Sequence, residues 1–418
     1  MFMSEWKTIG EIAEIYDGPH ATPKKIENGY YFLSISSLSN GNLDLSKSAK
    51  ICEEDYKKWT KRIVPIEGDL LFSYETRLGE AALMPANLQA CLGRRMGLLR
   101  PNLNFVRSDF LLFAWLSPEF QKVIKQNTIT GATVERIALS ELSDFPILLP
   151  SLFEQEKIVK ILTKLDQKIA LNNQINEELE AMAKTLYDYW FVQFDFPDEN
   201  GKPYKSSGGK MVYNDQLKRE IPEGWEVKQL GELCEFRNGI NYEKSETGDT
   251  LSKIVNVRNI SNSSTFVTTY DLDSISLDRK RIESYLVTDR TILITRSGIP
   301  GATRIVSDIP ANTIYSGFII GATVANLNLF YYVFYHLKNI EMLMSNQSAG
   351  TIMKNISQTT LSEIRIAIPN KEIQKVFSNQ VRSLLDVIEN NLKQNQELPQ
   401  LRDWLLPMLM NGQVKVEE

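Results

Sequence analysis

An internal repeat is the feature that most constrains this chain of 418 residues. The opening phrase WKTIGEIAEIYDG (6–18) returns as WEVKQLGELCEFRNG (225–239), which pairs Gly10 with Gly231 and Gly18 with Gly239 at an offset of 221. Further matches pair FLSISSL with IVNVRNI, LLFSYETRLGEA with ILITRSGIPGAT, and GATVERIALSELSDFPILLP with GTIMKNISQTTLSEIRIAIP, at offsets of 222, 222 and 219. A repeat this long indicates a duplicated domain, because solenoid repeats have periods of about 20–50 residues.

Each copy has the pattern of a mixed α/β globule. Short β-branched runs bounded by Gly, Asn, Ser or Pro, such as DFPILLP and EIRIAIP, predict strands. Residues 108–126 and 328–346 predict one helix in each copy, the first opened by a Ser/Asp cap. We call residues 1–150 head 1 and residues 225–370 head 2.

Long helices with a seven-residue apolar spacing follow each head, over residues 151–195 and 371–418. The first seam position is occupied by Ile158, Leu165, Asn172, Leu179 and Leu186 in one helix, and by Phe377, Leu384, Asn391, Leu398 and Leu405 in the other. The second is occupied by Ile161, Ile175, Met182 and Tyr189, and by Val387, Leu401 and Met408. Pro399 and Pro407 predict that the second helix kinks or ends early.

The matched asparagines, Asn172 and Asn391, indicate that the two helices pair with each other, because a polar seam residue fixes register and partner. The alternative is that each helix simply lies on its own head. Antiparallel pairing needs the shorter connection. Residues 196–224, rich in Gly, Pro and Ser, then form a linker. The predicted fold is α+β, with two mixed α/β heads separated by a long antiparallel two-helix coiled coil and related by a pseudo-twofold axis.

Composition excludes several classes of protein. Three cysteines, far apart, form no disulfide framework and fit a reducing cytoplasm, and no apolar run is long enough for a signal peptide or membrane span. Only two histidines exist, one in each head, and there is no phosphate-binding loop or dinucleotide fingerprint. A non-catalytic recognition protein is therefore expected. The net charge of −5 means that any DNA binding depends on local basic clusters or on a partner.

Several stretches resemble the specificity subunits of bacterial type I restriction-modification systems. LEAMAKTLYDYWFVQFDFP (179–197), with NGKPYKSSGGKMV and REIPEGWEVKQLGEL after it, is similar to their central conserved region. LRDWLLPMLMNGQVKV (401–416) is similar to their C-terminal conserved region. DGPHATPKK (17–25) and GDLLFSYETRLGEAALM (68–84) are similar to parts of their target recognition domains.

The resemblance implies a non-catalytic subunit that acts on double-stranded DNA with two methyltransferase subunits and two restriction (motor/nuclease) subunits. Each target recognition domain would read one half of a bipartite site, and the helices would fix the gap between the halves. Neither a cofactor nor a metal is expected in this chain. S-adenosylmethionine is expected in the partner that methylates adenine, and ATP and Mg in the restriction subunit.

Candidate DNA-contacting residues are the Arg, Lys, Asn, Ser, Thr and His side chains of polar loops, whose types suit base edges or phosphates. In head 1 they are His20, Thr22, Lys24, Lys25, Arg77, Arg94 and Arg95; in head 2 they are Arg237, Asn238, Lys244, Arg258, Asn259, Arg296 and Ser297. For each of them, the alternative is an ordinary solvated charge or local ion pair. For the whole chain, the alternatives are a protein-binding scaffold and a free-standing nuclease.

Overall fold

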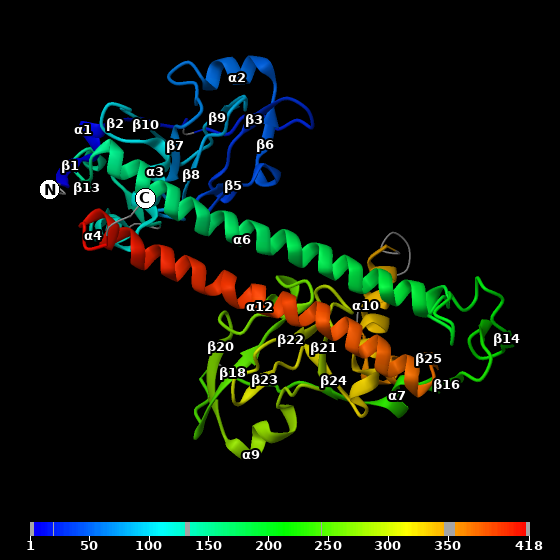
Figure 1. Ribbon diagram of the computed structural model, residues 1–418. Helices are drawn as coiled ribbons and strands as arrows, with labels where there is room; N and C mark the ends of the chain where they lie inside the picture. The colour runs from blue at the N-terminus through cyan, green and yellow to red at the C-terminus, as the bar shows by residue number, and fades with distance from the viewer. Residues whose placement is uncertain (1–3, 20, 130–133, 244, 347–355, 415–418) are drawn as a thin grey trace. The chain divides into compact units, whose positions relative to one another are not determined.

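The structure is a computed structural model, and it describes residues 4–19, 21–129, 134–243, 245–346 and 356–414. The chain forms two compact units (Figure 1). The first unit comprises residues 1–170 and 395–418, and the second comprises residues 171–394. Each unit therefore contains one head together with a part of each long helix.

Head 1 is built on a four-stranded sheet and a three-stranded sheet. The first has the order β2-β10-β7-β8 (Ala13–Asp17, Met96–Pro101, Leu70–Ser73, Ala81–Leu83) and the second β6-β3-β9 (Ala49–Ile51, Tyr30–Phe32, Ala90–Cys91). Strand β1 (Glu5–Thr8) pairs antiparallel with β13 (Pro146–Leu149). Minor elements are α1 (Ile9–Ile12), β4 (Leu38–Ser39), β5 (Asn42–Leu43), α2 (Glu53–Trp59), β11 (Thr128–Ile129), β12 (Arg136–Ile137) and α5 (Leu139–Leu142).

Head 2 repeats this topology, with one additional strand at the edge of its larger sheet. Its larger sheet has the order β17-β24-β21-β22-β19 (Cys234–Asn238, Ile319–Val324, Thr291–Thr295, Thr303–Val306, Phe266–Val267), and its smaller sheet β20-β18-β23 (Asp273–Leu277, Thr250–Val255, Thr313–Tyr315). Strand β16 (Glu226–Gln229) pairs with β25 (Arg365–Ile368), as β1 pairs with β13. The remaining helices are α7 (Leu230–Leu233), α8 (Val257–Ser261), α9 (Arg279–Ile282), α10 (Phe330–Asn346) and α11 (Gln358–Ser362). The common strand order confirms the predicted duplication.

The predicted single helix over residues 108–126 is wrong. The segment forms two helices, α3 (Ser108–Leu116) and α4 (Pro118–Gln126). Proline lacks the N–H that would continue α3 and is well suited to the first turn of a new helix. The Ser117 hydroxyl caps that helix by accepting the Phe120 N–H at 3.2 Å. In head 2 the corresponding helix, α10, is continuous from Phe330 to Asn346.

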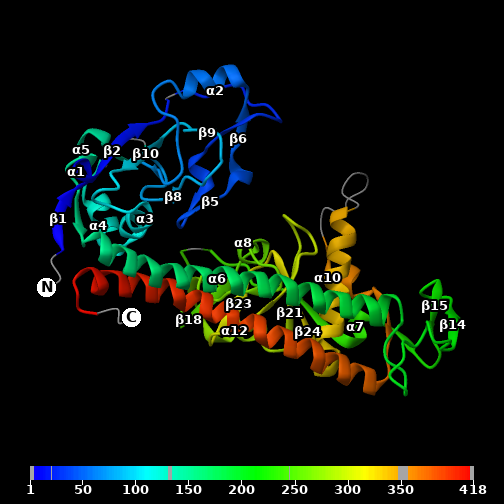
Figure 2. The same cartoon turned by 45° about the horizontal axis from the view of Figure 1, so that its top comes forward.

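Helices α6 (Leu152–Tyr187) and α12 (Lys371–Met410) run antiparallel within each unit (Figures 1 and 2). In the second unit, Asn391 Nδ2 donates to Asn176 Oδ1 at 2.9 Å, and Asn172 Nδ2 donates to Gln394 Oε1 at 3.2 Å. In the first unit, Arg402 Nη1 donates to Asp166 Oδ1 at 3.2 Å. As the residue numbers of these contacts increase along α6, the numbers of their partners on α12 decrease. This order confirms the predicted antiparallel pairing. The two asparagines take Asn176 and Gln394 as partners rather than each other.

The ten residues of the first seam position are all buried or half-buried, but the second position is partly wrong. Met182, Tyr189, Val387 and Leu401 are exposed, at 56%, 38%, 45% and 41%. Each helix also packs on its own head, so the buried stripe is wider than a coiled-coil seam and follows the helical period more closely. Phe377, for example, is fully buried in the core of head 2. Both interpretations therefore hold: the two helices pair with each other, and each also packs on its own head.

Two other expectations about the helical regions differ from the structure. Helix α12 continues through both Pro399 and Pro407, so the predicted early end is wrong. Helix α6 is followed by a π-helical turn, Asp188–Val192.

The segment expected to be a linker forms the hairpin β14 (Met211–Asn214) and β15 (Arg219–Pro222), and its Ile221 is buried in the head 2 core. Aromatic side chains flanking the hairpin, Phe196 and Trp225, stack there with ring centroids 5.2 Å apart.

Candidate nucleic-acid interface

The repeated opening phrase brings two predicted reading segments of head 1 together. Strand β2 pairs antiparallel with β10, and the Gly18 N–H donates to the Met96 carbonyl at 2.8 Å. A Cβ at Gly18 would lie only 2.4 Å from the Gly93 carbonyl oxygen, so only glycine fits there. The segment after β2 therefore starts directly beside the turn that carries Arg94 and Arg95.

Gly239 does the same in head 2. Its N–H donates to the Ile319 carbonyl at 2.9 Å, and a Cβ there would lie 2.3 Å from the Ser316 carbonyl oxygen. The repeated phrase thus encodes a close approach of two backbone segments, and the same glycine is needed in both heads.

Thr22, Lys24 and Lys25 are exposed and lie in the irregular segment between β2 and β3. Their side chains make no hydrogen bond or ion pair with any residue the structure describes, so all three are free to meet a ligand. His20 lies outside the described residues.

The three arginines predicted in head 1 differ in availability. Arg77 donates to Glu80 Oε1 at 3.1 Å and to the carbonyls of Ile35 and Ser36. Arg95, with φ of +69°, forms an ion pair with Glu75 at 2.7 Å. Arg94 is exposed and has no such partner in the described part of the chain. Of the three, Arg94 is the one ready to contact an anion.

In head 2, the predicted residues of β17 lie at its end. Arg237 is exposed and donates to Glu235 Oε1 at 2.8 Å. The Asn238 side chain is half-buried and makes no hydrogen bond within the described residues. Lys244 lies outside those residues.

Helix α8 (Val257–Ser261) carries two of the predicted residues, Arg258 and Asn259. Asn259 is only 4% exposed, its Oδ1 accepts the Asn256 N–H at 2.8 Å and its Nδ2 donates to the Asp271 carbonyl at 3.1 Å. Both ends of its amide are occupied, so Asn259 serves as a structural capping residue in this structure. Its neighbour Arg258 is exposed and pairs with Asp273 at 2.8 Å.

Arg296 and Ser297 directly follow β21 and are half-buried. The Arg296 Nη1 donates to the Gly317 carbonyl at 3.2 Å, and its Nε is buried with no hydrogen-bond partner among the described residues. The Arg296 Nε–H is therefore a hydrogen-bond donor that is still unpaired, and an unpaired buried N–H is unfavourable.

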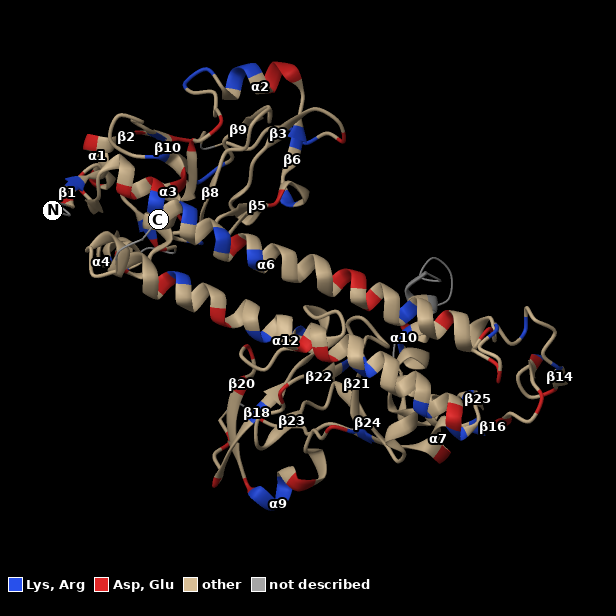
Figure 3. Cartoon of the chain, viewed as in Figure 1, with Lys and Arg blue, Asp and Glu red and all other residues tan. Residues whose placement is uncertain are grey.

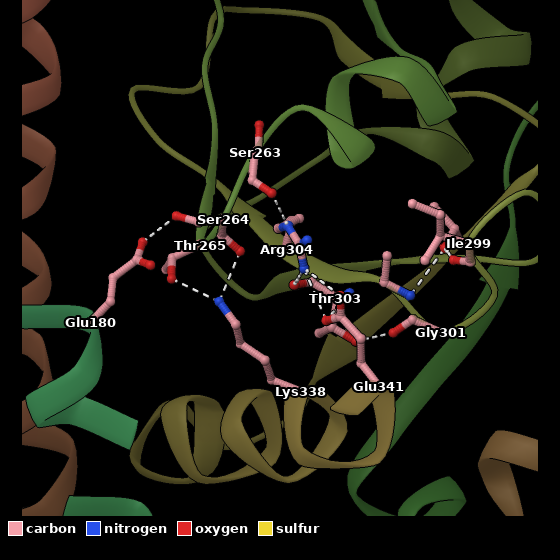
Figure 4. A network of polar contacts seen from close by, with 12 residues as sticks. Glu180, Ser263, Ser264, Thr265, Ile299, Gly301, Thr303, Arg304, Lys338 and Glu341 are labelled. Carbon is pink, nitrogen blue, oxygen red and sulfur yellow. Dashed lines mark hydrogen bonds and ion pairs between the residues drawn. The ribbon is translucent and has the colours of Figure 1, made fainter. Parts of the chain in front are cut away.

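A polar network that the sequence analysis did not predict joins α10 to the sheet of head 2 (Figure 4). Arg304 of β22, 8% exposed, donates to both carboxylate oxygens of Glu341, at 2.9 and 3.2 Å. Lys338 Nζ donates to the Ser264 carbonyl at 2.8 Å and to Thr265 Oγ1 at 2.9 Å, and burial lowers its pKa to about 8. The Ser264 hydroxyl donates to Glu180 of α6, so one chain of contacts links the long helix to the head.

His336, the histidine within the described residues, is placed in the interior of head 2. His336 Nδ1 lies 3.0 Å from the Tyr187 hydroxyl, and burial lowers the pKa of this imidazole to about 4. Among the described residues, no three His, Cys, Asp or Glu side chains are grouped to hold a metal ion. In the same part of the chain, no helix is both long and apolar enough to span a bilayer.

Comparison with known proteins identifies the family. The family model described as "Type I restriction modification DNA specificity domain" matches residues 3–181 and again residues 222–400. The chain belongs to this family. It thus contains two type I DNA specificity domains, one for each copy of the repeat.

Relatives agree with this assignment. The chain is 27% identical to the type I restriction enzyme MjaIX specificity subunit of Methanocaldococcus jannaschii, over 99% of this chain and 93% of the relative. It is 25% identical to the type I restriction enzyme HindI specificity subunit of Haemophilus influenzae, over 83% of this chain and 87% of the relative. A crystal structure of the S subunit from M. genitalium has the same fold, with a TM-score of 0.52, 16% identity, and coverage of 98% and 96%.

Proposed function

We propose that this chain is the specificity subunit of a type I restriction-modification enzyme. Head 1 reads one half of a bipartite DNA site and head 2 reads the other half. The observation that carries the proposal is the presence of two DNA specificity domains in one chain, with equivalent sheets but different polar residues after equivalent strands. Recognition of two different half-sites requires the same sheet framework in both heads and different polar residues in the loops.

Catalysis belongs to partner subunits in this proposal. Two methyltransferase subunits bind the helices and modify adenine with S-adenosylmethionine, and two restriction subunits use ATP and Mg to translocate and cleave DNA in the cytoplasm. Their positive surfaces add to the field at the DNA, which accounts for a specificity subunit with a net charge of −5. The lengths of α6 and α12 set the gap between the half-sites.

Methylome sequencing tests the proposal. Cells that make this chain with its methyltransferase partner are expected to carry a split motif with a modified adenine in each half. If partner binding is intact but no such motif appears, the chain is a scaffold and the proposal fails.

Arg94→Ala then tests the assignment of one head to one half. Because Arg94 is exposed and has no partner among the residues that the structure describes, its loss is expected to relax one half of the motif and leave the other half unchanged. One lost bidentate base contact corresponds to about 1–3 kcal/mol of discrimination. Equal weakening of both halves would contradict the assignment.

A further inference from the structure

Two short basic segments, outside the predicted reading residues, occur at matching places in the two heads. Helix α2 and the residues after it carry the run KKWTKR (57–62), and helix α9 carries RKR (279–281). Figure 3 shows basic residues on α9 and on α2 with the loop beyond it. All seven basic side chains of the two runs are exposed.

These two helices are equivalent in topology. Helix α2 follows β6, which pairs antiparallel with β3, and α9 follows β20, which pairs antiparallel with β18. The basic residues take different places in the two helices: Lys57 and Lys58 lie in the last turn of α2, and Arg279 and Lys280 are the first two residues of α9. The helices share little sequence, and the feature common to both segments is a group of exposed basic residues.

One arginine in each run ties the helix to the reading segment of its head. Arg62 forms an ion pair with Asp17, the last residue of β2. Arg281 pairs with Glu246 and donates to the Asn241 carbonyl at 2.6 Å, just beyond β17. Both basic segments are therefore held beside the chain that leaves the first strand of the larger sheet.

The other cations are left available. Lys58 lies 5.8 Å from the centre of the Trp59 ring, and neither Lys58 nor Lys61 makes an ion pair within the described residues. In head 2, Lys280 has no ion pair there, and the Arg279 side chain has only the electrostatic attraction of Asp249. Acidic neighbours exist: Glu53 pairs with Lys57 at 2.7 Å, Glu54 and Asp55 lie in the first turn of α2, and Asp278 and Glu283 flank α9.

A groove in head 1 shows what these cations face. Lys58, Lys61 and Arg62 line it together with the Asp17–Pro19 segment and Leu92, and its volume is about 280 Å³. Leu92 lies two residues before Arg94, and Pro19 lies three residues before Thr22. The basic segment thus borders the part of head 1 that carries the free candidate readers.

We propose that α2 with residues 60–62 and α9 bind the phosphates of the DNA strand beside the half-site that each head reads. The inference rests on the proposed function. Phosphate contacts supply affinity and position but carry no base information, and each one contributes about 0.9 to the dependence of log K on log salt. Lys58 and Lys61 make these contacts in head 1, and Arg279 and Lys280 make them in head 2.

The test uses the full chain in complex with its methyltransferase partner. Two double variants, Lys58→Gln/Lys61→Gln and Arg279→Gln/Lys280→Gln, are titrated with a duplex that contains the methylated motif, at several salt concentrations. Each is expected to bind roughly tenfold more weakly and to lower the salt slope by about 1.8, since two contacts are lost. The motif read by methylome sequencing stays the same.

Lys122→Gln/Lys125→Gln is the matched control, because it removes two exposed lysines from α4 in head 1. It is expected to leave affinity and slope unchanged. Unchanged affinity and slope in the α2 and α9 variants would overturn the inference, as would a change in the bases of the motif. A wild-type complex with no bipartite motif would instead refute the proposed function.

Discussion

Gly18 illustrates how single residues decide the arrangement of each head. The backbone at Gly18 adopts no left-handed conformation, so the glycine is needed only for space against the Gly93 carbonyl. The capping interaction of the same repeated phrase also recurs: Glu11 Oε2 accepts the Thr8 N–H at 2.7 Å, and Glu232 Oε1 accepts the Gln229 N–H at 2.9 Å. These local requirements explain why the sequence of this stretch remains similar in both copies.

Gly18→Ala is expected to destabilise head 1 by about 1–3 kcal/mol, because the added methyl group overlaps backbone that cannot move aside. The displaced β2–β3 segment should also weaken recognition of one half-site. Thermal unfolding of the chain and methylome sequencing measure the two effects.

Gly224→Ala provides the control for this substitution. Its φ is +82° and nothing lies within 4 Å of the added Cβ, so it introduces backbone strain without overlap. It should leave both half-sites unchanged. A Gly18→Ala chain with wild-type stability and motif would show that the close approach is dispensable.

At the scale of elements, α10 is fixed to its sheet by ionic contacts as well as by apolar packing. The Arg304–Glu341 pair is nearly buried, and Arg304 Nε also donates to the Ser263 carbonyl at 2.7 Å. The residues of β8 at the matching offset are Ala81 and Ala82, so head 1 has no equivalent of Arg304. The difference shows that the two copies share a frame but stabilise it differently.

Arg304→Met is expected to lower the free energy of unfolding by about 3–5 kcal/mol, because it leaves the Glu341 carboxylate buried without its partner. Arg304→Met/Glu341→Met removes both charges and should recover most of that loss. Chemical denaturation of the full chain measures all three proteins. A single variant as stable as the wild type, or a double variant less stable than the single, would contradict this account.

The whole molecule combines two specificity domains with two helices that each contribute to both units. Deleting residues 165–171 together with 396–402 removes one heptad from each helix while keeping Asn176 opposite Asn391. Each helix shortens by about 10 Å, which is the length of about three base pairs. The gap in the methylated motif is expected to shorten, or recognition to be lost.

Methylome sequencing of the deletion variant is compared with that of Asn391→Gln, which changes the helix pair without changing its length. The Asn391→Gln protein should keep the wild-type gap. An unaltered gap after the heptad deletion would show that the helices do not determine the spacing.

The sequence by itself determined the duplication, the long helices and their pairing, because repeats, heptads and matched asparagines are local or periodic signals. It also pointed to the stretches that follow β2 and β17. Only the tertiary structure decided which polar side chains remain available. Asn259 is used as a cap, Arg77 and Arg95 pair with internal carboxylates, and Arg94 pairs with no carboxylate in the described ranges of the chain.

Tertiary structure also decided the features for which sequence rules gave the wrong answer. Pro399 and Pro407 predict a kink or an early end, yet α12 does not end before Met410, because packing against α6 and the heads outweighs local propensity. Met182 fits a heptad but is exposed, because the helix has a head as well as a partner to cover. Burial and pairing depend on residues distant in sequence, and no local pattern records them.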